Sequence, residues 1–345
     1  MGCSCKSICK SVIEDLSELN INENENDNNI NNKINNIEKL NQIIINNPKL
    51  LSSLIKFQSY YRGMKLREKL QIDEQFNITS QTIMIDNEEL IRLLNEYPPL
   101  NDNIPVEIIG PIEYPSNNTI YYGEWDTLKN VRHGRGISVW NEGSKYLGYW
   151  VNDKANIKGK LIHGDGDIYE GEWIEDKPNG KGIYLHKDGT VYEGEWKNDK
   201  QDGKGREKWM DGASYEGEYK NGEKNGKGKF CWPDGSYYEG NFEKNIISGE
   251  GVYIFGDKRK YEGHWANNKM DGYGIFTWPD GRKYIGNYKN DKKDGYGELT
   301  TKDGKKYKGH WKNGKQHGEG EFFFPDKNIW KKGIWENGYR IKWIE

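Results

Sequence analysis

Apolar residues are scarce in this sequence. Only 34% of its 345 residues are hydrophobic, and no apolar run approaches the roughly 18 residues of a membrane-spanning helix. The start of the chain also lacks the apolar stretch of about 7–15 residues that a secretory signal carries. These absences argue against a thick core of Leu, Ile and Val, and they predict a chain that stays in the cytosol.

Cysteine is also rare, with four residues in the whole chain. Cys3, Cys5 and Cys9 lie close together at the start, and Cys231 lies far away in a strand-like stretch. A disulfide framework would spread its cysteines through the fold, and a structural zinc site needs a fourth ligand nearby. We therefore expect neither a disulfide scaffold nor a metal site.

Arrangements of residues that support catalysis are missing as well. The six histidines are scattered through the sequence, and no two have the spacing of metal ligands on a helix. The recurring Gly-Lys-Gly strings do not have the spacing of a phosphate-binding loop, nor its Ser or Thr after the lysine. The net charge of −3 and the pI near 6.2 argue against nucleic acid as the main partner, because neutralising phosphates requires a basic surface. We expect a non-enzymatic protein without a cofactor.

Glycine (42), tyrosine (23) and tryptophan (13) are abundant, and they recur in a pattern. The pattern is Tyr-x-Gly-x-aromatic, and from Gly148 to Gly309 each step is 23 residues. Only the first step is 25, with two extra residues in the loop after Trp125. The pattern begins at Tyr121, Tyr146, Tyr169, Tyr192, Tyr215, Tyr238, Tyr261, Tyr284 and Tyr307.

Each repeat reads as a β-hairpin, as in "YEGEWKNDKQDGKG" at 192–205. Residues i, i+2 and i+4 of a strand share a face, so Tyr192, Gly194 and Trp196 point one way. The polar string "KNDKQD" suits a hairpin loop, and Gly203 and Gly205 follow on the return strand. We expect the aromatic rings of each hairpin to fill the glycine gaps of the next hairpin.

This pattern resembles the MORN repeat family over residues 121–320, with nine units and a partial tenth at 330–335. The resemblance implies a mainly β fold, an elongated single twisted antiparallel sheet of about nine stacked MORN β-hairpins. A disordered or helical amino-terminal region precedes it. Residues 110–118 look like half a unit, and we expect residues 106–120 to form a capping strand before the array, which covers 121–345.

Three residues depart from the repeat pattern. Ile157 replaces the first paired glycine of the second unit. Lys258 and Lys327 replace the turn glycine of the sixth and ninth units. We expect irregular turns at these two lysines, and the last one would mark the capping end.

Three segments precede the array. Residues 1–46 are an Asn-rich low-complexity tail, for which disorder is the default. Asn47 and Pro48 can start a helix that covers 47–72. Residues 73–105 read as a helical linker, with a short helix at 86–96.

The stretch "FQSYYRGMKLREKL" matches an IQ motif in full. The resemblance implies binding of calmodulin or a calmodulin-like light chain, often without calcium. Residues 48–70 carry six cations against one anion, Glu68, and their apolar stripe can enter a partner's groove. The alternative is a basic amphipathic helix docked on the repeat array. The motif residues are Phe57, Gln58, Arg62, Gly63, Arg67 and Leu70.

The first residues, "MGCSCKSICK", favour lipid modification. Gly2 could be myristoylated after methionine removal, and Cys3 and Cys5 could be palmitoylated. One myristoyl chain binds membranes only marginally, so a second signal is needed. The stretch resembles the dually acylated amino termini of Src-type kinases, but Lys6 stands where Ser or Thr is favoured and Ser7 comes one place late. The alternative is an ordinary tail.

Together these features predict a non-enzymatic, membrane-tethered scaffold on the cytoplasmic face of a membrane. One alternative is a phosphoinositide or phospholipid binder that uses loop lysines such as Lys197, Lys200 and Lys204. Another is a structural component of a ciliary or cortical cytoskeletal assembly that uses the sheet edges. Resembling family members occur at membrane–cytoskeleton junctions and in cilia. The last, irregular unit is a natural place for a homodimer contact.

Overall fold

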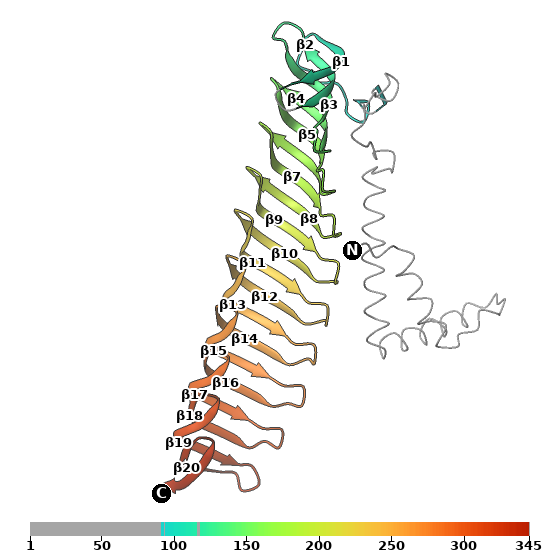
Figure 1. Cartoon of the computed structure of the whole chain (residues 1–345). Coiled ribbons are helices and arrows are strands. Elements are labelled where there is room, and N and C mark those ends of the chain that lie inside the picture. The colour runs from blue at the N-terminus through green and yellow to red at the C-terminus, as the bar shows by residue number, and fades with distance from the viewer. Residues whose placement is uncertain (1–90, 93, 116–117, 345) are drawn as a thin grey trace, which may run out of the picture.

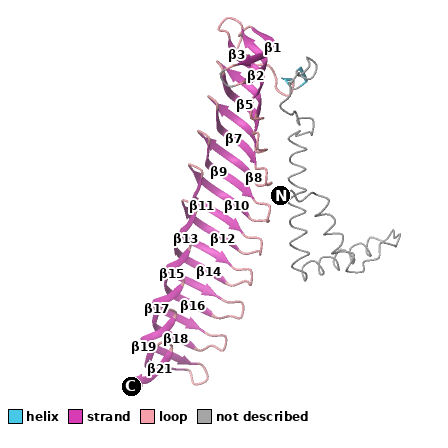
Figure 2. Ribbon diagram, in the orientation of Figure 1, coloured by secondary structure: helices cyan, strands magenta, loops and turns pink. Residues whose placement is uncertain are grey.

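The computed structural model describes residues 91, 92, 94–115 and 118–344. Within these residues, 21 strands form one antiparallel sheet. Every strand pairs with the next strand in the sequence, so the chain runs up and down along one long, twisted sheet (Figure 1). Strands and short turns make up nearly all of this part of the chain (Figure 2). The predicted fold class is therefore confirmed.

The strands follow one another at short intervals. Their bounds are β1 (Val106–Tyr114), β2 (Thr119–Asp126), β3 (Val131–Val139), β4 (Lys145–Val151), β5 (Lys154–Ile162), β6 (Ile168–Ile174), β7 (Lys177–Leu185), β8 (Val191–Lys197), β9 (Lys200–Lys208), β10 (Ser214–Lys220), β11 (Glu223–Cys231), β12 (Tyr237–Glu243), β13 (Ile246–Ile254), β14 (Lys260–Ala266), β15 (Lys269–Thr277), β16 (Lys283–Lys289), β17 (Lys292–Thr300), β18 (Lys306–Lys312), β19 (Lys315–Phe324), β20 (Ile329–Glu336) and β21 (Tyr339–Ile344).

The hairpin turns are shorter than the sequence predicted. Strands β8 and β9 extend through "KNDKQD" and leave only Asn198 and Asp199 between them. Both residues have positive φ, 49° and 74°, as the two central residues of a type I′ hairpin turn require. Asn and Asp tolerate that conformation better than most residues, which explains their repetition here. The first hairpin has a longer turn after Asp126, where the sequence has its two extra residues.

The tyrosines fill the glycine gaps of their own hairpin, not those of the next one as predicted. Tyr192 is fully buried. A Cβ on Gly205 of the paired strand would lie 2.5 Å from the Tyr192 hydroxyl oxygen and 2.6 Å from ring carbon Cε2. The hydroxyl of Tyr192 donates a 3.0 Å hydrogen bond to the carbonyl oxygen of Glu195 on its own strand. The ring lies over its own hairpin because that hydrogen bond holds the hydroxyl group against its own strand.

The second aromatic position joins one hairpin to the previous one. Trp196 packs edge-on against Tyr192 at 5.3 Å and against Tyr169 of the previous hairpin at 5.2 Å, between ring centroids. Its indole N–H donates to the carbonyl oxygen of Gly182 at 3.4 Å. Edge-to-face pairs at this distance are each worth about 0.5–1.5 kcal/mol. The predicted coupling between hairpins therefore rests on the tryptophan position.

The first glycine of each Gly-x-Gly pair has a different function from the second. Gly203 has φ of 104° and lies where the register between β8 and β9 shifts. A residue at such a bulge adopts a conformation that side chains disfavour. Ile157 holds the equivalent place with φ of 64° and is 45% exposed. The bulge is thus kept even where the glycine is lost.

The turn at Lys258 is regular, so the predicted irregularity there is wrong. Lys258 has φ of 69°, and its N–H donates to the carbonyl oxygen of Phe255 at 2.9 Å. The lysine side chain is exposed, so only its backbone must take the glycine-like conformation. At Lys327 the turn does change: the positive φ moves to Asn328, whose N–H bonds to the carbonyl oxygen of Pro325.

Candidate functional site

The site residues predicted from the sequence lie outside the described residues. They are the lipidation residues Gly2, Cys3 and Cys5, and the motif residues Phe57, Gln58, Arg62, Gly63, Arg67 and Leu70. The expected helix at 86–96 falls within the description only at its end, where Ile91, Arg92 and Leu94 have helical backbone. The repeat array itself is therefore the described candidate surface.

The sheet has two faces of different chemistry. The aromatic face carries the Tyr, Gly and Trp positions and is buried by its own rings. The polar face carries the residues between them. Because hairpins stack in register, one polar-face position forms a continuous central row from strand to strand. The central row is Tyr122, Ile137, Leu147, Lys160, Glu170, Ile183, Glu193, Arg206, Glu216, Lys229, Glu239, Val252, Glu262, Ile275, Ile285, Glu298, Lys308, Glu321 and Lys332.

The middle of the central row alternates in charge. Arg206 and Glu216 form an ion pair at 2.9 Å, and Lys229 and Glu239 form one at 3.4 Å. All four side chains are exposed, so each pair contributes only about 0.2–1 kcal/mol. These charges leave the surface polar without giving it one sign.

A shallow hollow of about 950 Å³ lies on the polar face over β9 to β14. Its lining contains both signs, including Arg206, Lys229, Glu239 and Glu250. Such a hollow suits a segment of mixed charge better than a small anion, because its carboxylates would repel the anion.

A second hollow brings together the lysines of the alternative, lipid-binding hypothesis. Its lining includes Lys197, Lys200 and Lys204 beside the turn of the fourth hairpin. Glu195 and Asp202 line the same hollow. The lysines thus gather as a lipid-binding site would require, but carboxylates next to them reduce the positive potential.

At its amino-terminal end the polar face holds a segment of this chain. Leu94 is 1% exposed and packs against Tyr122, Ile137 and Val139. Tyr97 packs edge-on against Tyr149, with ring centroids 5.4 Å apart. This contact buries apolar side chains of the central row that would otherwise face water.

Polar contacts fix the same segment in place. The Arg135 guanidinium donates to the carbonyl oxygen of Tyr97 at 3.3 Å and forms an ion pair with Glu124 at 2.5 Å. The Tyr149 hydroxyl donates to the carbonyl oxygen of Pro98 at 2.7 Å.

A histidine holds the end of the segment. His133 Nε2 lies 2.6 Å from Asp102 Oδ2, and this hydrogen bond lowers the pKa of Asp102. Sequence reasoning missed the docking of residues 94–102. Its signal was the change at the first units, where Ile137 and Leu147 stand at positions that are charged in most later units, and Tyr149 stands where later units have Glu, Asn or His.

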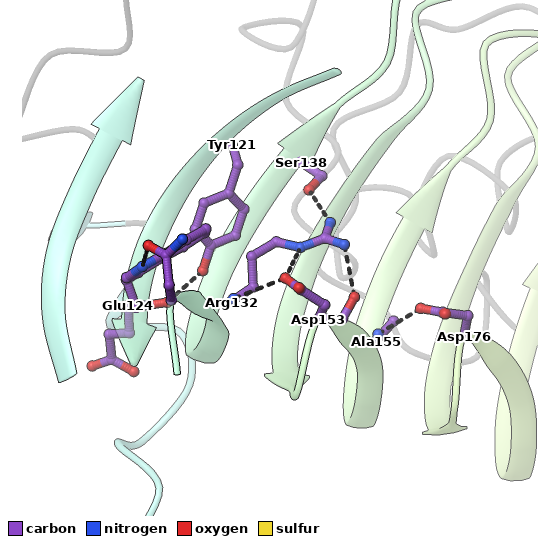
Figure 3. A network of polar contacts seen from close by, with 9 residues as sticks. Tyr121, Glu124, Arg132, Ser138, Asp153, Ala155 and Asp176 are labelled. Atoms are coloured by element: carbon purple, nitrogen blue, oxygen red, sulfur yellow. Dashed lines mark hydrogen bonds and ion pairs between the residues drawn. The ribbon is translucent and has the colours of Figure 1, made fainter. Parts of the chain in front are cut away.

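The turn edge of the array is linked by backbone contacts. The N–H of Asp153 donates to the carbonyl oxygen of Arg132. In return, Asp153 Oδ1 accepts from the Arg132 N–H at 2.9 Å (Figure 3). Asp176 and Ala155 repeat the pair of bonds one hairpin later, with the side-chain bond at 2.7 Å. Each turn is thereby held by the hairpin before it, which keeps the array in register.

One amine lies among aromatic rings on the opposite face. The Lys293 Nζ lies 4.8 Å from the ring centre of Tyr284 and 4.7 Å from that of Trp311. Burial, with a smaller effect of the Arg282 charge, lowers the pKa of Lys293 to about 8. Burial also raises the pKa of the stacked tyrosines, Tyr192 among them, so these phenols stay neutral even near pH 10, where an exposed tyrosine ionises.

The described ranges contain no group of three His, Cys, Asp or Glu side chains that is placed to hold a metal ion. In the same ranges no helix has the length and apolar character needed to cross a membrane.

Comparison with known families matches the described array. The family model described as MORN repeat matches nine times, at residues 121–145, 146–168, 169–191, 192–214, 215–237, 238–258, 261–281, 284–306 and 307–329. No curated protein matches the sequence.

Some solved structures are similar at low scores. The TCP10 domain of Danio rerio CPAP is 11% identical, with a TM-score of 0.35, covering 61% of this chain and 99% of that domain. The TCP domain of Drosophila melanogaster SAS-4, solved with a proline-rich motif of Ana2, is 13% identical, with a TM-score of 0.30, covering 56% and 96%. TM-scores in this range do not establish a common fold.

Proposed function

The chain belongs to the MORN repeat family, and from that premise we propose that it is a non-enzymatic scaffold tethered to a membrane. The array would present its polar face to protein partners. The IQ-like segment would recruit calmodulin or a related light chain, and acyl groups at Gly2, Cys3 and Cys5 would hold the chain at the membrane.

One observation supports the scaffold role most directly. The polar face holds residues 94–102 through an apolar contact at Leu94 and through hydrogen bonds to two backbone carbonyls, those of Tyr97 and Pro98. A surface that binds one chain segment by side chain and backbone has the chemistry to bind others. The contact consists of packing and hydrogen bonds, which are the interactions that a scaffold uses.

The light-chain arm is tested by a calmodulin pull-down with the full-length chain, with and without calcium. Arg62→Glu reverses a charge inside the motif, so we expect at least a tenfold loss of recovered calmodulin. Lys39→Glu makes the same charge change outside the motif and should retain full recovery. Equal recovery with both variants would refute the light-chain role.

The tether is tested by fractionation of cells that express the full-length chain. Gly2→Ala removes the acceptor for myristate, so most of the protein should move to the soluble fraction. Ser4→Ala, a neighbouring change without an acyl acceptor, should stay with membranes. Membrane retention of the Gly2→Ala protein would show that the tether is not at this residue.

A second candidate is direct binding of phosphoinositide headgroups by Lys197, Lys200 and Lys204. The hollow that these lysines line favours it. Full-length protein made without acylation should then float with vesicles that contain phosphoinositide, and Lys200→Glu should reduce that flotation. The acids Glu195 and Asp202 in the same hollow favour the scaffold over this candidate.

A third candidate is a structural part in a ciliary or cortical assembly, or a homodimer through the last unit. Strand β21 ends the sheet and carries Tyr339, 77% exposed, and Ile341, 58% exposed. An unpaired edge with exposed apolar side chains favours contact with another strand. Sedimentation would show a dimer that the variant Ile341→Lys converts to monomer.

A further inference from the structure

The central row contains two apolar cross-strand pairs at equivalent places. Ile137 of β3 pairs with Leu147 of β4. Ile275 of β15 pairs with Ile285 of β16, six repeats later in the sequence. Between these two pairs, the equivalent cross-strand pairs of the central row each contain at least one charged residue.

The first pair is covered and the second is open. Leu94 packs against Ile137, which is 4% exposed. Ile275 and Ile285 are only partly buried. Beside them Tyr273 is 55% exposed and Tyr296 is 48% exposed. Half-exposed aromatic rings around a pair of isoleucines are typical of an interaction site.

Charge distinguishes this second site from the first. Lys283 lies two residues from Ile285 on the same strand, and Lys308 continues the central row one strand beyond Glu298. Both lysines are exposed, and neither forms an ion pair with another described residue. Glu262 and Glu298 already have partners, in Lys260 at 2.7 Å and Lys306 at 3.8 Å. The free charge of the site is therefore positive.

The second site also differs in its apolar wall. Thr277 and Glu262 stand where the first site has Val139 and Tyr122. Tyr273 stands where Arg135 contacts the docked backbone, and its hydroxyl can donate the same kind of hydrogen bond. At the second site Tyr273 therefore supplies the aromatic contact that Tyr149 supplies at the first site.

We propose that the polar face over β15 to β17 is a second docking site, which binds an acidic partner segment that carries a leucine and an aromatic residue. The leucine would lie on Ile275 and Ile285, and the aromatic residue would lie against Tyr273 or Tyr296. Carboxylates of the partner would meet Lys283 and Lys308. The inference rests on the proposed scaffold function, for which it names one surface and the chemistry of its partner.

The test uses full-length protein and a synthetic peptide with the sequence of residues 91–103, "IRLLNEYPPLNDN", which combines the required side chains. A photoreactive leucine replaces the residue at position 94 of the peptide. We expect cross-links to fragments that contain β15 and β16. Ile275→Glu should weaken binding at least tenfold, because it places a carboxylate where the leucine lies.

The matched control is Ile183→Glu, the same change in the same row, in the third of the nine repeats. It should leave peptide binding unchanged. If Ile275→Glu lowers the melting temperature strongly, the variant that combines Lys283→Glu and Lys308→Glu replaces it and should weaken binding by a similar factor at low salt.

Cross-links confined to β3 and β4, or binding that neither the isoleucine change nor the lysine changes affect, would overturn the second site. Calmodulin recovery and membrane association, measured on the same variants, should stay at the level of the unmodified chain. Failure of the docking site is thereby distinguished from failure of the scaffold as a whole.

Discussion

At the scale of single residues, each position in the repeat fixes the backbone conformation and the surroundings of its side chain. This holds even where the residue type is poorly suited to them. Ile157 takes a left-handed backbone conformation, φ 64°, that Gly180 and Gly203 take in the units that follow. Lys293 places an amine among rings at a position that is Met270 one unit earlier. Ile157 has a cost in backbone conformation, and Lys293 has a cost in the burial of its amine. Both costs can be measured.

Replacing Ile157 by glycine should stabilise the chain. The left-handed conformation costs a residue with a Cβ about 1–2 kcal/mol, and the half-exposed isoleucine gives up little buried area. We expect the urea midpoint of Ile157→Gly to correspond to a gain of about 1 kcal/mol. The reverse change one unit later, Gly180→Ile, should cause a loss of at least that size. A lower midpoint for Ile157→Gly would mean that its side chain contributes more than its backbone costs.

Stability should rise with pH in a window set by Lys293. Its folded pKa of about 8 lies below that of a free lysine, so between pH 8 and 10 the unfolded chain binds the proton and the folded chain does not. The free energy of unfolding should therefore increase by up to about 1.4 kcal/mol per pH unit.

The rise should end near pH 9, because many tyrosines have a pKa raised by burial, and each begins to lose its proton there in the unfolded chain but not in the folded one. Lys293→Met introduces the residue of the previous unit and should remove the rise; Lys292→Met, at the exposed neighbour, should retain it. A flat profile for the unmodified chain would show that the surrounding rings stabilise the charged amine enough to cancel its burial.

At the scale of one hairpin, the two-residue turn is both the end of one unit and the attachment to the unit before it. The second turn residue donates its N–H to the previous hairpin in successive units, as Asp176 does to Ala155 and Asp199 does to Pro178. The side-chain bond is possible only where the facing residue has an N–H. Pro178 has none, and this provides a natural comparison.

The side-chain contribution of the turn follows from that comparison. Asp176→Ala removes the 2.7 Å bond from the Ala155 N–H and leaves that group without its side-chain partner. Asp199→Ala makes the same change at a turn that faces Pro178. Thermal melts should show Asp176→Ala to be the more destabilising by about 1 kcal/mol. Equal effects would mean that the turn backbone alone joins the hairpins.

Much of the hairpin could be read from the sequence, and the limits have physical reasons. Strict alternation around Tyr192 and the 23-residue period fixed the faces and the fold class. The turn length was misjudged because "KNDKQD" is polar throughout, and composition does not reveal that Asn198 and Asp199 alone make the turn. The direction of the Tyr192 ring depends on its hydrogen bond to Glu195, which no spacing predicts.

At the scale of the whole molecule, the polar face changes along its length, while the two aromatic positions of the opposite face hold an aromatic residue in every unit. It is apolar and covered at Leu94, charged in the middle, and apolar again at Ile275 and Ile285. Sequence periodicity identifies the units but treats them as equal. The docking of residues 94–102 could not be predicted, because it depends on which non-repetitive segment returns to which unit.

The central claim is that one chain links a membrane to a light chain, and co-flotation measures it directly. Acylated full-length protein is mixed with vesicles and calmodulin, and the floating fraction is assayed for both proteins. The account predicts that calmodulin floats with the unmodified chain, and that Arg62→Glu floats without calmodulin. With Gly2→Ala neither protein should float. Calmodulin that fails to float with the unmodified, membrane-bound chain would contradict the account.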